Sequence, residues 1–439
     1  MEELDRQNRA FEKRLKRQVI GKPHRFLAVV PLGFEQTFVR EFNTLGIQTT
    51  ICDPDIAQAS NHPQVIGDGK VEFTAKLVEA WKIAAYSRIA NRILMHIADF
   101  KAENFRELEK KANEIPWELF LDNKGTARVD IHVTCKHSRL YHSDAVAERL
   151  DKILPAPSTP QNLFVTLVDD RCTLWLDLAG EELYKRGHER FVNDAPLKET
   201  IAAAMIFEAI KSAIGPAQSG AITLIDPMAG SGTFSLEAAY MASSLIPGIC
   251  RDFALKHQPA FKEATWNFLI RRDNGAAATI TKIVTSDISE RSIEIIEHNI
   301  ECSPLANIAP SENSPIITPQ LRDFFSYTAK DIADTCGKSA PIIVLNPPYG
   351  KRLDFDAPKL YTKIGRHLAA LASGLKQLGK SLTVAILAPK DDTRDGAKYT
   401  CTANLLRECP ALSPESNSAA KCIATSHGGF SLSVFIAKI

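Results

Sequence analysis

Three polar residues, each at the end of a predicted strand, carry the clearest chemical signal in this sequence. Asp226 closes the run "ITLID", Asp287 closes "KIVTSD", and Asn346 directly follows "PIIVL". The carboxyl ends of neighbouring strands in an open α/β sheet meet at one edge, where such sheets bind their ligands. Two carboxylates and an amide at that edge would offer acceptors to the amino and hydroxyl groups of a ligand.

A loop of small residues follows Asp226 in the stretch "DPMAGSGT", before a helix that we expect to begin at Thr233. Gly230 and Gly232 would allow a ligand to approach the backbone and the N-terminus of this helix closely. The loop has neither the GxGxxG pattern of dinucleotide enzymes nor the lysine of a phosphate loop. It suits a ligand with an amino-acid moiety, whose ammonium would pair with Asp226. Taken alone, the loop fits an ordinary strand-to-helix turn equally well.

Asp287 precedes a second expected helix, which begins near Ser289. An acid at this position of an open α/β sheet commonly accepts hydrogen bonds from ribose hydroxyls. Taken alone, Asp287 fits an acidic partner of the helix N-terminus better, and its place after the glycine loop favours ribose. The spacing from Asp226 is about three times the usual ~20 residues, so residues 241–280 are predicted to be an insertion that returns to the same sheet.

The stretch "NPPY" places Asn346, Pro347, Pro348 and Tyr349 directly after the third strand. The prolines fix their φ angles and lack an N–H, so the Asn346 and Pro347 oxygens can act as acceptors at one point. Two acceptors close together suit an exocyclic NH₂ group, and Tyr349 offers a flat face for a base. The alternative is a rigid turn that only ends the strand.

The bulk composition is that of a globular protein with reduced thiols. The chain has 439 residues, 45% of them hydrophobic and 24% charged, with a net charge of +1, so nucleic acid would have to bind through local basic patches. We find no run of about 18 apolar residues and no signal peptide, which predicts a cytoplasmic protein without membrane contact. The nine cysteines are odd in number and form no CxxC pair, so no metal site is predicted.

Strand and helix patterns alternate after residue 196, which predicts an α/β domain with a parallel sheet and helices on both faces. Strands are expected at 222–226, 282–287, 341–345 and 382–388, and "GGFSLSVFIAKI" is expected to form an antiparallel edge strand. The chain is predicted to have a basic tail at 1–25, mixed α+β modules at 26–100 and 101–190, and a domain at 191–439. The basic tail is either a solvated segment or an arm that touches phosphates. The two modules can share strands of one sheet. A β-hairpin is expected with its turn at 169–171.

Together these motifs resemble the S-adenosylmethionine-dependent amino methyltransferases. More closely, the chain is similar to bacterial THUMP-domain methyltransferases that act on guanine N2 in large-subunit ribosomal RNA. The stretches that carry this resemblance are "PLGFEQTFVREFNTLGI", "SRIANRI", "SRLYHSDAVAERL", "LYKRGHER", "APLKETIAAAMI", "DPMAGSGTFSLEAA" and "NPPYGKRL". The chain departs from the pattern at Lys351, where the family often has an acid. It has room for one methyltransferase domain, whereas some family members carry two.

The resemblance implies a Rossmann-like methyltransferase domain with a mostly parallel seven-stranded sheet, preceded by ferredoxin-like and THUMP modules. It implies S-adenosylmethionine as cofactor, 23S ribosomal RNA or a large-subunit assembly intermediate as partner, and no metal. Asn346, Pro347, Pro348 and Tyr349 would be catalytic. The expected cofactor-binding residues are Asp226, Pro227, Gly230, Ser231, Gly232, Thr233, Asp287, Asp323, Pro196, Lys198 and Thr200. The expected RNA-binding residues are Lys136, Arg139, Tyr141, Lys185, Arg186 and Arg190.

Several alternatives stay open from the sequence. Asp323 is either a contact to the adenine amino group or a surface acid in a loop, and Lys198 with Glu199 is either part of the donor site or a helix-start pair. The same chemistry could act on guanine N2 of tRNA or on adenine N6. A protein that keeps the fold as a non-catalytic RNA-binding assembly factor is the rival from another class.

Overall fold

The computed structural model describes residues 2–47, 63–193, 196–215, 220–271, 279–308, 317–349, 356–390 and 400–439. Lys351, singled out above, lies outside these residues. The chain divides into two compact units. The first unit comprises residues 1–30, 38–187 and 248–271, and the second comprises 31–37, 188–247 and 272–439.

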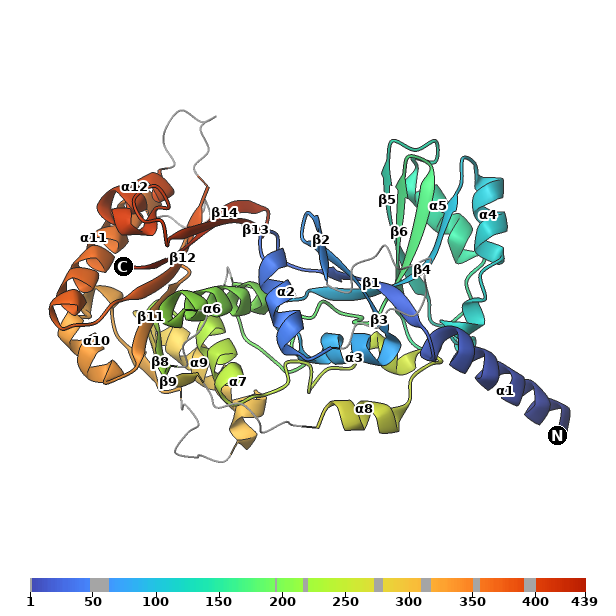
Figure 1. Ribbon diagram of the computed structural model, residues 1–439, viewed down its shortest axis with the longest axis horizontal. Helices are drawn as coiled ribbons and strands as arrows, with labels where there is room; N and C mark the ends of the chain where they lie inside the picture. The colour runs from blue at the N-terminus through green and yellow to red at the C-terminus, as the bar shows by residue number, and fades with distance from the viewer. Residues whose placement is uncertain are drawn as a thin grey trace. The chain divides into compact units, whose positions relative to one another are not determined.

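The first unit is built on a seven-stranded sheet in the order β2-β3-β1-β4-β7-β6-β5. Its strands are β1 (Pro23–Val29), β2 (Gln64–Gly67), β3 (Lys70–Lys76), β4 (Arg92–Lys101), β5 (Val129–Lys136), β6 (Gln161–Val168) and β7 (Arg171–Asp177). Its helices are α1 (Glu2–Leu15), α2 (Glu35–Thr44), α3 (Leu77–Tyr86), α4 (Phe105–Asn113), α5 (Ser143–Asp151) and α8 (Glu263–Leu269). Figure 1 shows α4 and α5 beside β5 and β6 in this unit.

The two modules that were predicted on either side of residue 100 contribute to one sheet. β4, from the first module, pairs with β7, from the second, in antiparallel register over Leu94–Lys101. The boundary near residue 100 is therefore not a boundary between compact units. The predicted hairpin is confirmed as β6–β7, and its turn residues Asp169 and Asp170 have φ values of 50° and 62°, which short acidic side chains tolerate.

The basic N-terminal segment forms a helix. α1 runs from Glu2 to Leu15, and a π-helical turn follows at Lys16–Ile20. Leu15 and Val19 are buried, which ties the end of this segment to the core of the first unit.

The predicted insertion returns to the sheet as expected, but part of it belongs to the first unit. β9 pairs with β8 in parallel, so the chain rejoins the sheet after the insertion. Residues 248–271 lie in the first unit, where the Leu255 N–H donates to the Leu178 carbonyl and the Gln258 Nε2 donates to the Asp177 carbonyl.

The second unit is built on a seven-stranded sheet in the order β10-β9-β8-β11-β12-β14-β13. Its strands are β8 (Ile222–Asp226), β9 (Ile280–Asp287), β10 (Pro319–Leu321), β11 (Ala340–Leu345), β12 (Thr383–Pro389), β13 (Lys421–His427) and β14 (Phe430–Lys438). Its helices are α6 (Glu199–Ile214), α7 (Thr233–Ala242), α9 (Glu290–Glu301), α10 (Ala329–Cys336), α11 (Ala357–Gln377) and α12 (Cys401–Glu408). The strands β10, β9, β8, β11 and β12 are parallel to one another. The strand order reverses between β8 and β11, and open α/β sheets bind their ligands at such a point.

The C-terminal strand is antiparallel as expected, but the prediction that it lies at the edge is wrong. β14 pairs with β12 on one side and with β13 on the other, so β13 is the edge strand. The residues from Leu432 to Ala437 are all buried, because both faces of β14 are covered. The continuous apolar run "VFIA" fits this internal position better than an edge.

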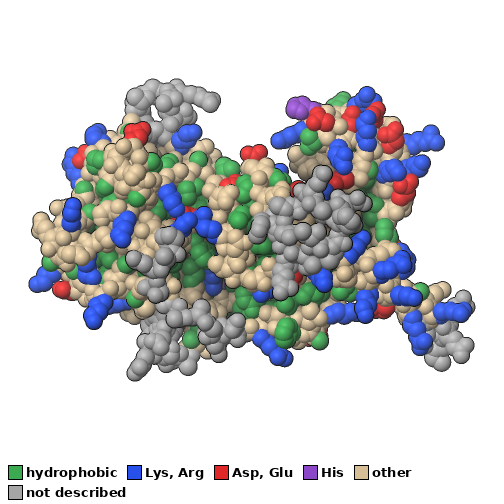
Figure 2. Space-filling model, in the orientation of Figure 1, with side chains coloured by type: hydrophobic (Ala, Val, Ile, Leu, Met, Phe, Trp, Pro, Cys, Tyr) green, Lys and Arg blue, Asp and Glu red, His purple; other side chains and the backbone are tan. Residues whose placement is uncertain are grey.

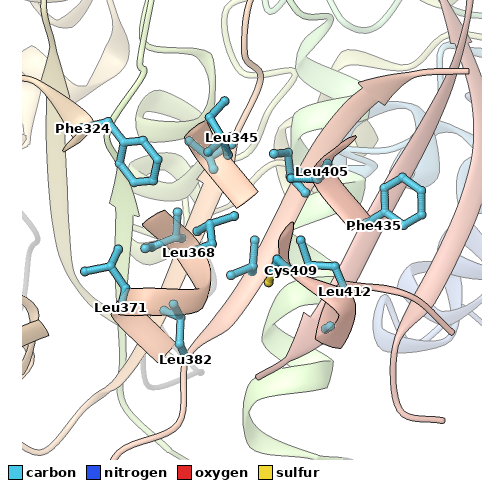
Figure 3. Close-up of a cluster of buried hydrophobic side chains, with 14 of the residues drawn as sticks. Phe324, Leu345, Leu368, Leu371, Leu382, Leu405, Cys409, Leu412 and Phe435 are labelled. Carbon is cyan, nitrogen blue, oxygen red and sulfur yellow. The ribbon is translucent and has the colours of Figure 1, made fainter. Parts of the chain in front are cut away.

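The hydrophobic core of the second unit fixes the strand that precedes Asn346. Figure 3 shows Leu345 of β11 among side chains from neighbouring elements, with Leu368 and Leu371 from α11 and Leu405 from α12. Leu345 is fully buried, so the end of β11 is held firmly. No helix in the described ranges is long and apolar enough to cross a membrane.

Candidate functional site

The parallel register brings the three strand ends together at one edge of the second sheet. Asp226 pairs with Thr285 of β9, and Ile225 pairs with Ile343 of β11. Asp287 and Asn346 therefore follow strands on either side of β8. The sequence prediction that these polar residues end neighbouring strands is confirmed by the sheet order β9-β8-β11.

The glycine loop is shaped by its contacts to β9 and α9. Gly230 has a φ of 57° and donates its N–H to Asp287 Oδ2 at 2.9 Å, so the loop is bound to the end of β9. Gly232 has a φ of 77°, and a Cβ there would lie 3.0 Å from a carbon of Ile296 on α9. Ser231 and Thr233 are buried at the start of α7. The two glycines are thus required by backbone conformation, and Gly232 also by close packing.

Asp226 is a fully buried acid with one unmatched oxygen. Its Oδ2 accepts from the Ser235 N–H at 3.2 Å and from the Ser235 hydroxyl at 2.8 Å. Its Oδ1 is buried and has no partner in the described part of the chain. Burial raises the pKa of Asp226 to about 7, and the negative charge of Asp287 adds to this shift. A cation at Oδ1 would relieve both effects.

Asp287 has two backbone partners. Besides the Gly230 contact, its Oδ1 accepts from the Ser289 N–H at 2.9 Å, and Ser289 caps α9 through its own side chain. Asp287 therefore supports the start of α9, as one of its two sequence interpretations expected, and it also holds the glycine loop. Its role as a ribose acceptor stays a prediction. The next residue, Ile288, is 73% exposed at this sheet edge. Ile288 was not among the residues predicted for the site, although the sequence shows an apolar residue directly after the acid that ends the strand.

The NPPY segment leaves an acceptor unmatched beside the glycine loop. Asn346 Oδ1 is buried and lacks a partner among the described residues. Pro347 is buried and Pro348 is exposed. The Tyr349 ring lies edge-to-face with Phe430 of β14, at 6.1 Å between centroids, and burial raises the pKa of its hydroxyl to about 12. Tyr349 is therefore neutral at physiological pH.

Comparison with known families decides what kind of domain carries this edge. A family model described as "RMKL-like, methyltransferase domain" matches residues 186–385, which include all three strand ends. The match identifies this region as a methyltransferase domain. The resemblance to methyltransferases that was seen in the sequence is thereby confirmed, while the THUMP assignment stays a prediction.

Similar proteins and structures agree with the methyltransferase domain. A ribosomal RNA large subunit methyltransferase K/L from Allochromatium vinosum is 31% identical over 72% of this chain and 44% of its own length. The chain spans about half the length of the curated relatives it matches. A possible methylase from Clostridium difficile 630 has a TM-score of 0.70 at 22% identity, covering 95% of this chain and 98% of that one. A methyltransferase complexed with SAH has a TM-score of 0.69 at 21% identity, with the same coverage. The fold is thus the expected Rossmann-like methyltransferase fold.

The other predicted cofactor residues lie in the same unit as the methyltransferase domain's glycine loop. Asp323 follows β10, and its Oδ1 accepts from the Phe325 N–H at 3.0 Å, so it also shapes its own loop. The Pro196 carbonyl lies 2.8 Å from His427 Nε2, which fixes the approach to α6. Lys198 precedes α6 without a side-chain cap, and Thr200 is buried in its first turn. Pro227 is buried directly after Asp226.

Two of the six predicted RNA-binding residues make their contacts inside the protein. Arg186 is buried in the first unit, where it donates to the Leu183 and Arg88 carbonyls, both at 2.9 Å, so it does not present its charge to a phosphate. Arg190 lies at the glycine loop of the methyltransferase domain. It pairs with Glu199 and donates to the hydroxyls of Ser231 and Thr233. The residues next to Arg190 in the sequence predicted a polar connector. No nearby sequence pattern indicated that Arg190 would contact Glu199, Ser231 and Thr233.

The remaining RNA candidates are exposed in the first unit. Lys136 ends β5, and Arg139 and Tyr141 lie in the loop between β5 and α5, where the Arg139 N–H donates to Asp170 Oδ1 at 2.7 Å. The Arg139 guanidinium also pairs with Glu103, and Lys185 pairs with Glu181 at 2.8 Å. Figure 2 shows basic and acidic side chains mixed over the end of this unit that holds β5, α4 and α5. A phosphate would therefore have to compete with acidic partners.

Proposed function

We propose that this chain transfers a methyl group from S-adenosylmethionine to the exocyclic N2 of a guanine in large-subunit ribosomal RNA. The observation that carries the proposal is the buried Oδ1 of Asn346, which has no hydrogen-bond partner among the described residues and lies at the end of the strand next to β8. An unmatched buried acceptor costs about 1–3 kcal/mol, and a donor on a ligand would recover that cost on binding. An amino group that enters between this oxygen and the loop would supply the missing donor.

The residues around the glycine loop fit the methyl donor. Asp226 Oδ1 would accept from its ammonium, because this oxygen is buried and has no partner among the residues that the structure describes. Asp287 at the end of β9 would accept from the ribose hydroxyls, and the exposed Ile288 would cover the adenine face. Asp323 would approach the adenine amino group. S-adenosylmethionine supplies an electrophilic methyl group on a sulfonium.

Asn346 and the Pro347 carbonyl would hold the target amino group. Two hydrogen bonds accepted from the N2 hydrogens favour a tetrahedral nitrogen, whose lone pair then points toward the methyl group. Tyr349 would stack on the base after the nucleotide leaves its helix. The remaining acceleration comes from positioning, and the proton of the methylated nitrogen can leave to water after transfer. Pro348 stiffens the segment, so that the two acceptors stay in place before the base arrives.

The assignment of the substrate rests on the relatives. Curated proteins similar to this chain are named ribosomal RNA large subunit methyltransferases K/L. The exposed basic and aromatic residues of the first unit would supply contacts to phosphates and unstacked bases. We include the 23S molecule in the proposal on this basis.

The proposal can be tested by methylation of ribosomal RNA purified from cells that lack the gene. The wild-type chain and labelled S-adenosylmethionine should give N2-methylguanosine in 23S ribosomal RNA by nucleoside mass spectrometry. Asn346→Ala should reduce the transfer rate by on the order of 100-fold with donor affinity unchanged, because the acceptor acts on the base. Asn307→Ala, an exposed substitution of the same kind, should leave the rate unchanged.

The other outcomes separate the rivals. N6-methyladenosine as the product would refute the base assignment, and labelling confined to tRNA would refute the RNA class. Binding of S-adenosylmethionine and RNA without any transfer would support the non-catalytic assembly factor.

A further inference from the structure

Three metal-ligating side chains meet on the outer side of α9 in the second unit. Glu189, His298 and Cys302 place one potential ligand atom each within 4.8 Å of the others, among the residues that the structure describes. None of them belongs to the proposed donor or base site. Glu189 comes from the segment before α6, whereas the other two come from α9 and its C-terminal cap.

We infer that this cluster is a zinc site formed by the Glu189 carboxylate, the His298 imidazole and the Cys302 thiolate. His298 and Cys302 are four residues apart, so they lie on one face of the helix. His298 Nε2 and Cys302 Sγ are 3.4 Å apart. Ligands bound at 2.0–2.3 Å around a tetrahedral ion lie about 3.3–3.8 Å from each other, so this pair already has the spacing that zinc needs.

The segment that carries Glu189 is fixed to α9 by independent contacts. The Phe191 ring stacks on His298 at 4.0 Å between centroids with 23° between the planes, which orients the imidazole. The Phe191 N–H donates to Asn299 Oδ1 at 2.7 Å, and Asn299 Nδ2 donates back to the Phe191 carbonyl at 2.9 Å. Asn299 is buried, so these bonds hold the segment beside the helix whether or not an ion is bound.

The donor set favours zinc over harder cations. One thiolate, one imidazole and one carboxylate suit a borderline-soft ion, whereas Mg²⁺ and Ca²⁺ prefer oxygen ligands throughout. Glu189 is exposed and the other two ligands are half-buried, so a water molecule can complete the fourth position from solvent. Binding would release the thiol proton of Cys302 to solvent. The absence of a CxxC pair in the sequence hid this arrangement, because its third ligand is remote along the chain.

A bound ion would join the Glu189 segment to α9 beside the methyl-donor loop. Arg190, next in the chain, donates to Ser231 Oγ at 3.3 Å, and Asn193 Nδ2 donates to Ser292 Oγ at 3.3 Å. The zinc site would therefore stabilise the segment that supports the glycine loop from outside. The inference does not depend on the proposed function, since ion binding is measured directly.

Cobalt titration of the metal-free full-length chain tests the site, because Co²⁺ reports its ligands by absorption. One equivalent should give tetrahedral bands and a thiolate charge-transfer band, and zinc should displace it. Cys302→Ser should abolish the charge-transfer band. It should also weaken the affinity for cobalt by more than 10–100-fold, which is the typical loss when a residue that only hydrogen-bonds to a metal ligand is removed. Cys422→Ser, at an exposed free thiol, should leave the spectrum and affinity unchanged.

Glu189→Gln provides a second readout at an exposed position that the fold does not require. It should keep the charge-transfer band and weaken the affinity at least about tenfold. Absence of stoichiometric binding to the wild-type chain, or a thiolate band that survives Cys302→Ser, would refute the site. Unchanged affinity in Glu189→Gln would refute the three-ligand set.

Discussion

The buried carboxyl of Asp226 predicts a specific pH dependence of donor binding. Burial raises its pKa to about 7 in the protein without ligand, with a further contribution from Asp287. The proposed ammonium contact at Oδ1 requires the carboxylate. Binding below pH 7 must therefore remove a proton from Asp226, and donor affinity must rise with pH.

The size of the effect follows from that pKa. With a pKa of about 7, the carboxylate fraction rises about 15-fold from pH 5.5 to pH 7, so the affinity should rise by the same factor. This factor corresponds to about 2 kcal/mol at about 1.4 kcal/mol per tenfold change. The range ends at pH 7 because the α-amino group of the ligand itself titrates near 7.7–8.0.

Calorimetry with S-adenosylhomocysteine measures both the affinity and the protons released. This ligand keeps the amino-acid moiety and transfers no methyl group. In buffers of different ionisation enthalpy at pH 5.5, binding should release nearly one proton per ligand, falling to about half a proton at pH 7. Asp226→Asn should bind more weakly at pH 7 and show a flat pH dependence, whereas Asp334→Asn, at an exposed acid, should behave as wild type.

Unfolding measurements of the ligand-free protein check the same pKa independently. The pKa of Asp226 in the folded protein lies above the ordinary value of 3.8 for an Asp carboxyl, so the folded protein binds the extra proton between about pH 4 and pH 7. The free energy of unfolding should fall as pH rises through this window, relative to Asp226→Asn, by up to about 4 kcal/mol. A flat affinity in the wild type, or an equal slope in Asp226→Asn, would refute the assigned role of Asp226.

Two further predictions concern the base and the RNA. Tyr349→Phe should retain most activity because stacking needs only the ring, whereas Tyr349→Ala should lose about 1–3 kcal/mol of base binding, seen as a higher KM for RNA; equal losses in both variants would contradict a stacking role. Charge reversal of both Lys136 and Arg139 to Glu should weaken RNA binding and reduce its salt dependence by about two phosphate contacts, measured by filter binding over a salt series. The matched reversal of Lys363 and Lys376, exposed on α11, should do neither, and equal effects of both pairs would indicate only a change in net charge.

The sequence located the strand ends well because their signal is local. Asp226, Asp287 and Asn346 each end a buried run, and a polar residue that follows such a run marks the edge of a sheet. The start of α9 was likewise visible, because Ser289 is an effective N-cap. These features depend on residues within a few positions of each other.

The features that the sequence did not reveal depend on distant partners. Arg186 is buried because the Arg88 carbonyl needs a donor, and Arg190 lies at the glycine loop because Glu199 and two hydroxyls surround it. The residues around an arginine in a polar connector do not indicate whether its side chain will be buried or will contact a distant loop. The position of β14 depends in the same way on its pairing with β13, although its apolar run "VFIA" already favoured an internal strand.

Two unmatched oxygens lie at the same edge of the second sheet. Asp226 Oδ1 and Asn346 Oδ1 are both buried without partners in the described structure, and they follow adjacent strands of one sheet. Each costs free energy in the unliganded protein, whereas the neighbouring Asp226 Oδ2 has two donors from Ser235. If the two residues only shaped turns, replacing them with apolar residues of similar size would be neutral or stabilising. Ligands that donate hydrogen bonds to these two oxygens would instead recover the costs on binding. On our proposal, the ammonium of S-adenosylmethionine donates to Asp226 and the target amino group donates to Asn346, on opposite sides of the transferred methyl group.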